Sequence, residues 1–119
     1  MKRNNVRLLT DAEIENVKSR FVFRLEEDKI AVDAFRNNRT TYHPINESFS
    51  LNIKNLRKIT FTLDAINIWL NLLLRGEKPN LLDVQQATNK LVLSYQPITL
   101  EKVKNILVEQ KNLKIKEKK

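Results

Sequence analysis

The sequence predicts a mainly α, single-domain bundle of four or five helices. Apolar residues recur every three or four positions over most of the 119 residues. Residues that cap helix N-termini precede several of these apolar runs. The single glycine, Gly76, and two of the three prolines, Pro79 and Pro97, lie in the breaks between the last three runs. A chain of this length is large enough for one hydrophobic core.

A first helix is predicted over residues 10–36. Thr10 and Glu13 have the spacing of a capping box, in which each side chain pairs with the backbone N–H of the other residue. The apolar residues that follow occupy one helical face: Ile14, Val17, Phe21 and Leu25. This face can continue through Val32 and Phe35.

A short β-hairpin is the alternative for residues 20–34. Apolar residues also alternate here, first Phe21, Phe23 and Leu25, then Ile30, Val32 and Ala34. Residues 26–29 would form the turn, where Asp28 is the only residue type that turns favour. Because this turn has no glycine, the helix is the preferred prediction.

Residues 37–50 are predicted to be a loop, because most of them are short polar or turn-forming residues. A helical C-terminal unit over 51–113 follows. Its first element is a short helix over 50–58. Residues 114–119 are predicted to be a basic tail.

Three further helices are predicted over 62–74, 80–94 and 99–113. Thr62, Asn80 and Thr99 are their N-cap residues. Gly76 follows the first of these helices, where a left-handed C-terminal cap is common, and Pro79 prevents continuation.

The helix over 62–74 is apolar on nearly every side. Nine of the twelve residues from Leu63 to Leu74 are apolar, and the three polar residues form one narrow stripe. Such a helix is either central in the domain or supports contact with a protein partner or a second copy of the chain. Trp69 is predicted to be a core residue.

The charge balance favours an acidic partner. There are 22 Lys and Arg residues against 14 Asp and Glu residues, for a net charge of +8. The excess lies in residues 1–9, 34–60 and 101–119. Cysteine is absent, no secretory signal opens the sequence, and no apolar run approaches the roughly 20 residues of a membrane span. We therefore expect a cytoplasmic protein without membrane contact.

Catalysis is not expected, and neither is a metal or another cofactor. The single histidine, His43, lies in the turn-rich stretch, where no base–nucleophile pair is apparent. The acidic run at 26–28 would not converge on a cation from one helix face. A chain with one glycine has no glycine-rich phosphate loop.

Two groups of residues are the candidate contacts to nucleic acid. The last helix and the start of the tail contribute Lys102, Lys104, Asn105, Lys111 and Lys114. The segment before the apolar helix contributes Lys54, Arg57 and Lys58, with Arg36, Arg39 and Tyr42 upstream. Lysine contacts to phosphate supply affinity without reading sequence. Asn105 is the candidate for a base edge. The alternative for the last helix is a solubilising lysine face.

The C-terminal half resembles winged-helix and other helix-turn-helix domains. The resemblance is carried by Leu73–Val84 and Ile98–Leu107, in which Gly76, Pro79 and Thr99 mark the turns. It implies that the last helix enters the major groove of DNA. The hairpin wing that would follow the last helix has no counterpart in the few residues that remain.

The expected function is therefore binding of DNA or RNA without catalysis, through phosphate contacts from the last helix of an oligomer. The alternative is a small helical accessory or scaffold subunit of a larger protein or ribonucleoprotein complex, docking through the helix over 63–74.

Overall fold

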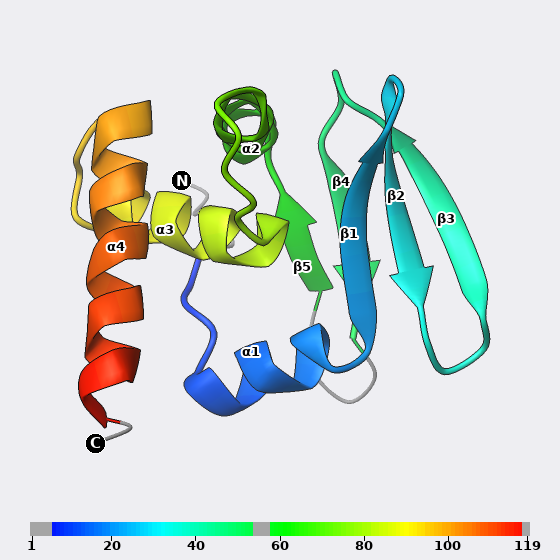
Figure 1. The fold of residues 1–119 in the computed structure, drawn as a ribbon, viewed down its shortest axis with the longest axis horizontal. Helices are drawn as coiled ribbons and strands as arrows, with labels where there is room; N and C mark the ends of the chain where they lie inside the picture. The colour runs from blue at the N-terminus through cyan, green and yellow to red at the C-terminus, as the bar shows by residue number, and fades with distance from the viewer. Residues whose placement is uncertain (1–5, 54–57, 118–119) are drawn as a thin grey trace, which may run out of the picture.

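The protein has an α+β fold, which corrects the predicted mainly α bundle. The computed structural model describes residues 6–53 and 58–117. Its elements follow in the order α1 (Asp11–Lys18), β1 (Phe21–Glu26), β2 (Lys29–Ala34), β3 (Arg39–Pro44), β4 (Phe49–Asn52), β5 (Lys58–Phe61), α2 (Leu63–Leu74), α3 (Leu81–Leu93) and α4 (Leu100–Glu117) (Figure 1).

The predicted helix over 10–36 is wrong beyond Lys18. Its capping box is present, with Glu13 N–H donating to Thr10 Oγ1 at 3.1 Å and Thr10 N–H donating to Glu13 Oε1 at 2.9 Å. After α1, the alternative hairpin forms from β1 and β2, which pair antiparallel with Phe23 opposite Val32. Alternation therefore prevails over helical spacing. No glycine is needed in the turn because Glu27 itself adopts a positive φ of 54°.

Two further predictions are wrong in the middle of the chain. Residues 39–44, predicted as loop, form β3, which pairs antiparallel with β2. The predicted helix over 50–58 is replaced by β4 and β5, an antiparallel pair with Phe49 opposite Phe61 and Leu51 opposite Ile59. These four apolar residues share one face of the pair, because side chains two positions apart in a strand point to the same face. Residues 54–57 lie outside the described part of the chain.

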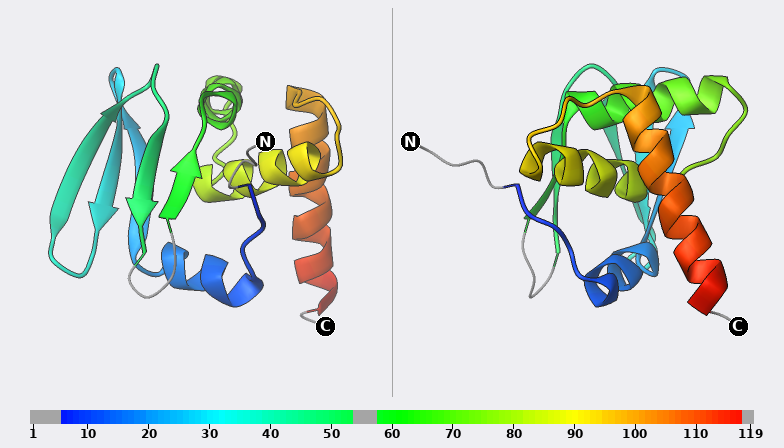
Figure 2. Two further views of the ribbon diagram at one scale, coloured as in Figure 1. Left: turned by 180° about the vertical axis from the view of Figure 1, so that it is seen from behind. Right: turned by 90° about the vertical axis from the view of Figure 1, so that its left-hand side faces the viewer.

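The elements stack in layers. The three-stranded sheet, in the order β1-β2-β3, lies at one side, the β4–β5 pair lies next to it, and α2, α3 and then α4 follow (Figures 1 and 2). Aromatic side chains join the two sheets. The ring centroids of Phe23 in β1 and Phe61 in β5 are 5.2 Å apart, and Phe61 in turn stacks on Phe49 of its own sheet with centroids 4.9 Å apart. Such contacts combine apolar burial with favourable ring geometry.

The helix α2 lies at the centre of the core. Its buried residues join a cluster with contributions from α1, β2, β4, β5, α3 and α4. Trp69 is 2% exposed and its indole Nε1–H donates to the carbonyl oxygen of Pro79 at 3.0 Å, which confirms the predicted core role. The apolar surface of α2 is thus covered mainly within the chain, although Leu63 and Leu74 at its ends remain exposed.

The three C-terminal helices form where they were predicted, although α4 continues to Glu117 and so includes part of the predicted tail. The side chain of Thr62 accepts from Ala65 N–H, that of Asn80 from Leu82 N–H and that of Thr99 from Lys102 N–H. Gly76 has φ 86° and completes a Schellman motif, in which Glu77 N–H donates to the Leu72 carbonyl at 3.1 Å.

Candidate nucleic-acid interface

The predicted contact residues do not form one surface. Lys102, Lys104, Asn105 and Lys111 lie on α4, whereas Lys58 begins β5 on another part of the fold. Lys54 and Arg57 lie outside the described residues, as does the side chain of Lys114. Within the part of the chain that is described, Lys111 of α4 and Lys58 line two different clefts.

The lysines of α4 are partly engaged inside the molecule. Lys104 Nζ lies 3.1 Å from Glu77 Oε2, and Lys102 Nζ lies 3.5 Å from Gln96 Oε1. Asn105 and Lys111 are exposed, so both remain accessible to a ligand. The cation of Lys104 is already opposed by a carboxylate, which weakens its attraction for phosphate.

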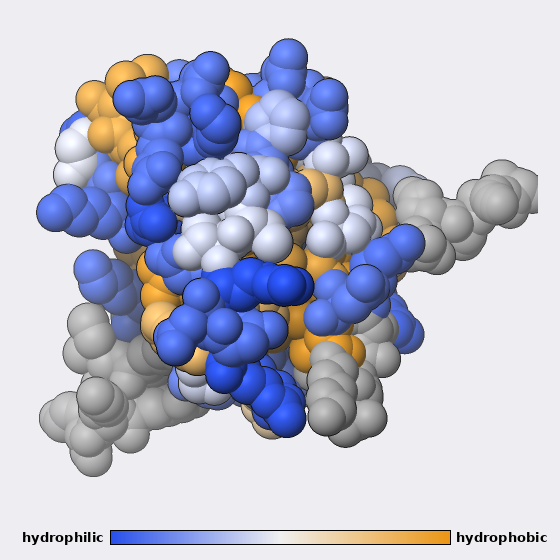
Figure 3. All heavy atoms as spheres, turned by 90° about the vertical axis from the view of Figure 1, so that its right-hand side faces the viewer, coloured by the Kyte–Doolittle hydropathy of each residue, from blue (hydrophilic) through white to orange (hydrophobic). Residues whose placement is uncertain are grey.

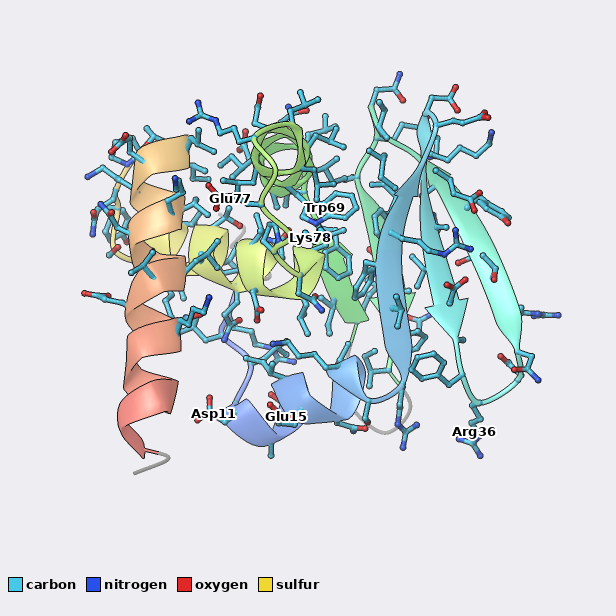
Figure 4. The ribbon with its side chains drawn as sticks, viewed as in Figure 1. Asp11, Glu15, Arg36, Trp69, Glu77 and Lys78 are labelled. Carbon is cyan, nitrogen blue, oxygen red and sulfur yellow. The ribbon has the colours of Figure 1, made fainter. Side chains whose placement is uncertain are left out.

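The cleft beside α4 has mixed charge. Lys111 lines this cleft together with two residues of the α2–α3 turn, Glu77 and Lys78. Figure 4 labels these two turn residues. The cleft also contains the ion pair between Lys18 Nζ and Asp83 Oδ2, at 3.0 Å. The lining contains both acidic and basic groups, so the cleft lacks the uniform positive charge that a phosphate backbone favours.

Three arginines gather at one end of the three-stranded sheet. Arg20 precedes β1, and its carbonyl accepts a hydrogen bond from Phe35 N–H at 3.0 Å just after β2. Arg39 begins β3 opposite Ala34 at the end of β2. Arg36 lies in the turn between these strands and extends away from the sheet (Figure 4). We call Arg20, Phe35, Arg36 and Arg39 the arginine end.

The positive charge of the arginine end is not neutralised within the described residues. No carboxylate there lies within ion-pair distance of any of the three arginines. The sequence contains no acid from residue 34 to residue 46. Arg36 and Arg39 are both exposed, so their guanidinium groups are available to a phosphate.

One exposed aromatic side chain accompanies these arginines. Phe35 is 54% exposed in the turn that carries Arg36, whereas Tyr42, 52% exposed on the edge strand β3, is opposite Ala31 and therefore lies on the other face of the sheet from Arg39. The face that carries β3 is otherwise mostly hydrophilic (Figure 3). An exposed ring beside arginines is the combination on which an unpaired base can stack while its phosphate is held.

The outward face of the same sheet is electrically balanced. Arg24 of β1 forms ion pairs with Glu26 and with Asp33, whose Oδ2 lies 2.8 Å from Arg24 Nε. Thr40 Oγ1 donates to Asp33 Oδ1 at 2.6 Å. The hydrogen bonds from Arg24 and then from Thr40 lower the pKa of Asp33 and keep it ionised. An anion is therefore attracted to the arginine end rather than to this face.

His43, on β3, packs against the second sheet. Its ring stacks on Phe49, with centroids 4.2 Å apart, and Thr41 Oγ1 lies 3.3 Å from its Nε2 atom. Burial lowers the pKa of His43 and favours the neutral ring. Among the described residues, no group of three His, Cys, Asp or Glu side chains is placed to hold a metal ion.

Sequence reasoning named Arg36 and Arg39 but missed Arg20. The signal for Arg20 was the alternative hairpin, because pairing of residues 21–26 with 29–34 places Arg20 beside the turn that follows β2. Of the helices in the described ranges, none is long and apolar enough to cross a bilayer.

Neither a family model, nor a curated protein, nor a solved structure matches this chain.

Proposed function

We propose that this protein binds nucleic acid without catalysing a reaction, and that the arginine end makes the phosphate contacts. The observation that carries the proposal is the gathering of Arg20, Arg36 and Arg39 at one end of the sheet, with no acidic partner among the described residues. Arginine matches phosphate with two parallel hydrogen bonds, and the net charge of +8 strengthens the long-range attraction.

A single strand suits this surface better than a duplex. Phe35 is an exposed ring beside these arginines, and stacking of an unpaired base on such a ring contributes about 1–3 kcal/mol. Bases within a duplex are already stacked on each other and are not available to this ring. Lys102 and Lys111 of α4 form the rival contact surface, on the opposite side of the layered fold (Figure 1).

A salt-titrated binding assay tests the proposal. Fluorescence anisotropy would compare a labelled single-stranded DNA, the same sequence as RNA and the duplex. We expect the single strands to bind more tightly, with affinity that falls steeply as salt increases. The double variant Arg36→Glu, Arg39→Glu should lose at least tenfold in affinity and flatten the salt dependence by about 1.4 in log–log slope, for two lost phosphate contacts.

The matched control changes the same amount of charge on α4. Lys102→Glu, Lys111→Glu should reduce affinity far less than the arginine variant. An affinity independent of salt would overturn nucleic-acid binding. A larger loss from the lysine variant would overturn the arginine end and return the contact to the C-terminal helix. Circular dichroism of each variant would verify that the fold is retained.

The oligomer and the accessory-subunit alternative have less support. Docking through residues 63–74 would rely on Leu63 and Leu74, which are 43% and 84% exposed, because most of the remaining apolar surface of α2 is buried in the core. Two leucines at opposite ends of a helix make a small contact compared with a stable interface.

A further inference from the structure

A cleft lies between β5, α3 and the segment before α1, apart from the arginine end. Its volume is about 650 Å³, which is within the usual range for small-molecule sites. The segment before α1 passes over α3 in the view from behind (Figure 2). Leu9 and Asn89 contribute to the wall where these two elements meet. We call this hollow the β5–α3 cleft.

The walls of the β5–α3 cleft are held in place by side-chain amides. Gln85 Oε1 accepts from Thr62 N–H at 2.8 Å, and Gln85 Nε2 donates to Asn89 Oδ1 at 2.8 Å. Gln86 is paired with the backbone of Leu9 in both directions. Asn89 Nδ2 donates to the carbonyl of Arg7 at 3.3 Å, which places the Arg7 backbone beside α3.

The side-chain amides of the cleft keep hydrogen-bonding capacity for a ligand. The amide oxygens of Gln85, Gln86 and Asn89 each accept a bond within the chain. The amide nitrogens of Gln86 and Asn89 each make one such bond, so each has a second N–H. These N–H groups can donate to a ligand that presents acceptor oxygens.

The charge of the lining favours an anionic ligand. Among the described residues that line the cleft, Arg7 and Lys58 are the charged ones, both exposed and on different walls, and none is acidic. Neither cation has an ion-pair partner among the described residues. Two cations facing one hollow favour a doubly charged oxyanion, for which a phosphate monoester is the common biological form.

Thr60 and Thr62 are the other polar residues of the lining. The apolar residues would contact an uncharged part of the ligand, and they comprise Val6, Leu9, Ile59 and Leu82. We propose that the β5–α3 cleft binds a small organic phosphate of nucleotide size, with the phosphate between Arg7 and Lys58 and the apolar or aromatic body against these four residues. The site requires no polymer and shares no residue with the arginine end, so it is independent of the function proposed above.

The test is a titration of the full chain with adenosine monophosphate, followed by NMR of backbone and side-chain amides. Saturable shifts are expected at Thr60, Gln86 and Asn89, which line the cleft. Adenosine, which lacks the phosphate, and inorganic phosphate, which lacks the body, should each bind at least tenfold more weakly. No saturation at about 10 mM, well above a weak millimolar dissociation constant, would overturn the proposal. Equal binding of adenosine and the monophosphate would also overturn it.

Variants locate the site. Arg7→Ala and Lys58→Ala should each weaken binding of the monophosphate several-fold, and both side chains are exposed, so the fold should be retained. Lys90→Ala is the control, since Lys90 belongs to α3 but does not line the cleft. Unchanged binding in the Arg7 and Lys58 variants would refute the assignment. The Arg36→Glu, Arg39→Glu variant should bind the monophosphate like the unmodified chain, so a failure of either proposal is recognised separately.

Discussion

The side-chain amide of Gln86 pairs with the backbone of Leu9 through two hydrogen bonds, as one strand residue pairs with its neighbour. Leu9 N–H donates to Gln86 Oε1 at 3.2 Å, and Gln86 Nε2 donates to the Leu9 carbonyl at 2.9 Å. The two residues are 77 positions apart, and Gln86 is only 5% exposed. The segment before α1 is therefore attached to α3 by a buried polar contact rather than by a strand.

Replacing Gln86 should destabilise the protein. The Gln86→Leu variant keeps much of the side-chain volume but leaves the N–H and carbonyl of Leu9 without their partners. Loss of hydrogen bonds in a buried setting costs about 1–3 kcal/mol. The free energy of unfolding, measured by urea titration, should fall by that amount. Gln96→Leu, at an exposed position, is the control. A Gln86→Leu variant as stable as its control would show that the pair contributes little.

The two helix C-caps with positive φ should respond in opposite directions to substitution. Gly76 has φ 86°, and no atom beyond its two chain neighbours lies within 4 Å of the position that a Cβ would occupy, so Gly76→Ala tests backbone conformation. We expect a loss of about 1–2 kcal/mol, the usual cost of a left-handed conformation for a residue with a Cβ. Thermal and urea unfolding measure it, and an unchanged stability would contradict this explanation of the cap.

Tyr95, which follows α3, already has the left-handed backbone conformation that is unfavourable for a residue with a Cβ. It has φ 57°, is 96% exposed and precedes Gln96, whose N–H donates to the Leu91 carbonyl at 2.8 Å. Because the ring makes little contact, Tyr95→Gly should raise the free energy of unfolding by up to about 1 kcal/mol. The same unfolding experiments apply. A decrease in stability would indicate that the ring contributes packing that its exposure does not suggest.

His43 should make the protein less stable in mild acid. Burial lowers its pKa below the ordinary value of about 6.5, so the unfolded chain binds the proton more readily than the folded chain. The free energy of unfolding therefore keeps the full contribution of the neutral His43 ring above about pH 6.5. This contribution decreases as the pH falls from about 6.5 towards the lower pKa of the folded state. Urea unfolding between pH 7.5 and about pH 5 measures this slope. The His43→Phe variant, which can still stack on Phe49, should have a flatter profile.

Asp33 should contribute a separate pH dependence at lower pH. Hydrogen bonds from Arg24 and Thr40 lower its pKa, so its contribution is present above the unfolded value of about 3.9 and is lost as the pH falls through the folded value. In Asp33→Asn this part of the acid profile should disappear, while the slope assigned to His43 remains. An acid profile below pH 4 identical to that of the unmodified chain would exclude Asp33 as its source.

The C-terminal helices were predictable because their signals are local. Thr62, Asn80 and Thr99 cap helices from three or fewer residues away, and Gly76 supplies the positive φ of a C-cap. Each interaction involves neighbours in the chain, so the residue types alone indicate it. The same is true of the capping box that begins α1.

The hairpin over residues 21–34 was ambiguous because both periodicities fit the same residues. Phe21 and Leu25 suit one face of a helix, yet with Phe23 they also suit one face of a strand. The choice depends on what covers that face. In the fold, Phe23 contacts Phe61 of β5, a residue 38 positions further along the chain, and the strand places it there.

The candidate interface was only partly predictable for the same reason. The positive charge and the acid-free stretch from residue 34 to residue 46 are visible in the sequence. The sequence does not show that Lys104 is opposed by Glu77, nor that Arg20 lies beside the turn that carries Arg36. Those facts depend on strand pairing and helix packing.

By itself, the sequence determined the three C-terminal helices with their caps, the capping box of α1, the core position of Trp69 and the excess of positive charge. Capping and backbone conformation act between near neighbours, and composition requires no structure at all. Only the tertiary structure decided that five strands form between α1 and α2 in the described ranges, that the apolar surface of α2 is covered mainly within the chain, and which cations remain without an acidic partner among the described residues. Strand pairing, burial and ion pairing join residues distant in sequence, so they are settled only when the chain packs around one core.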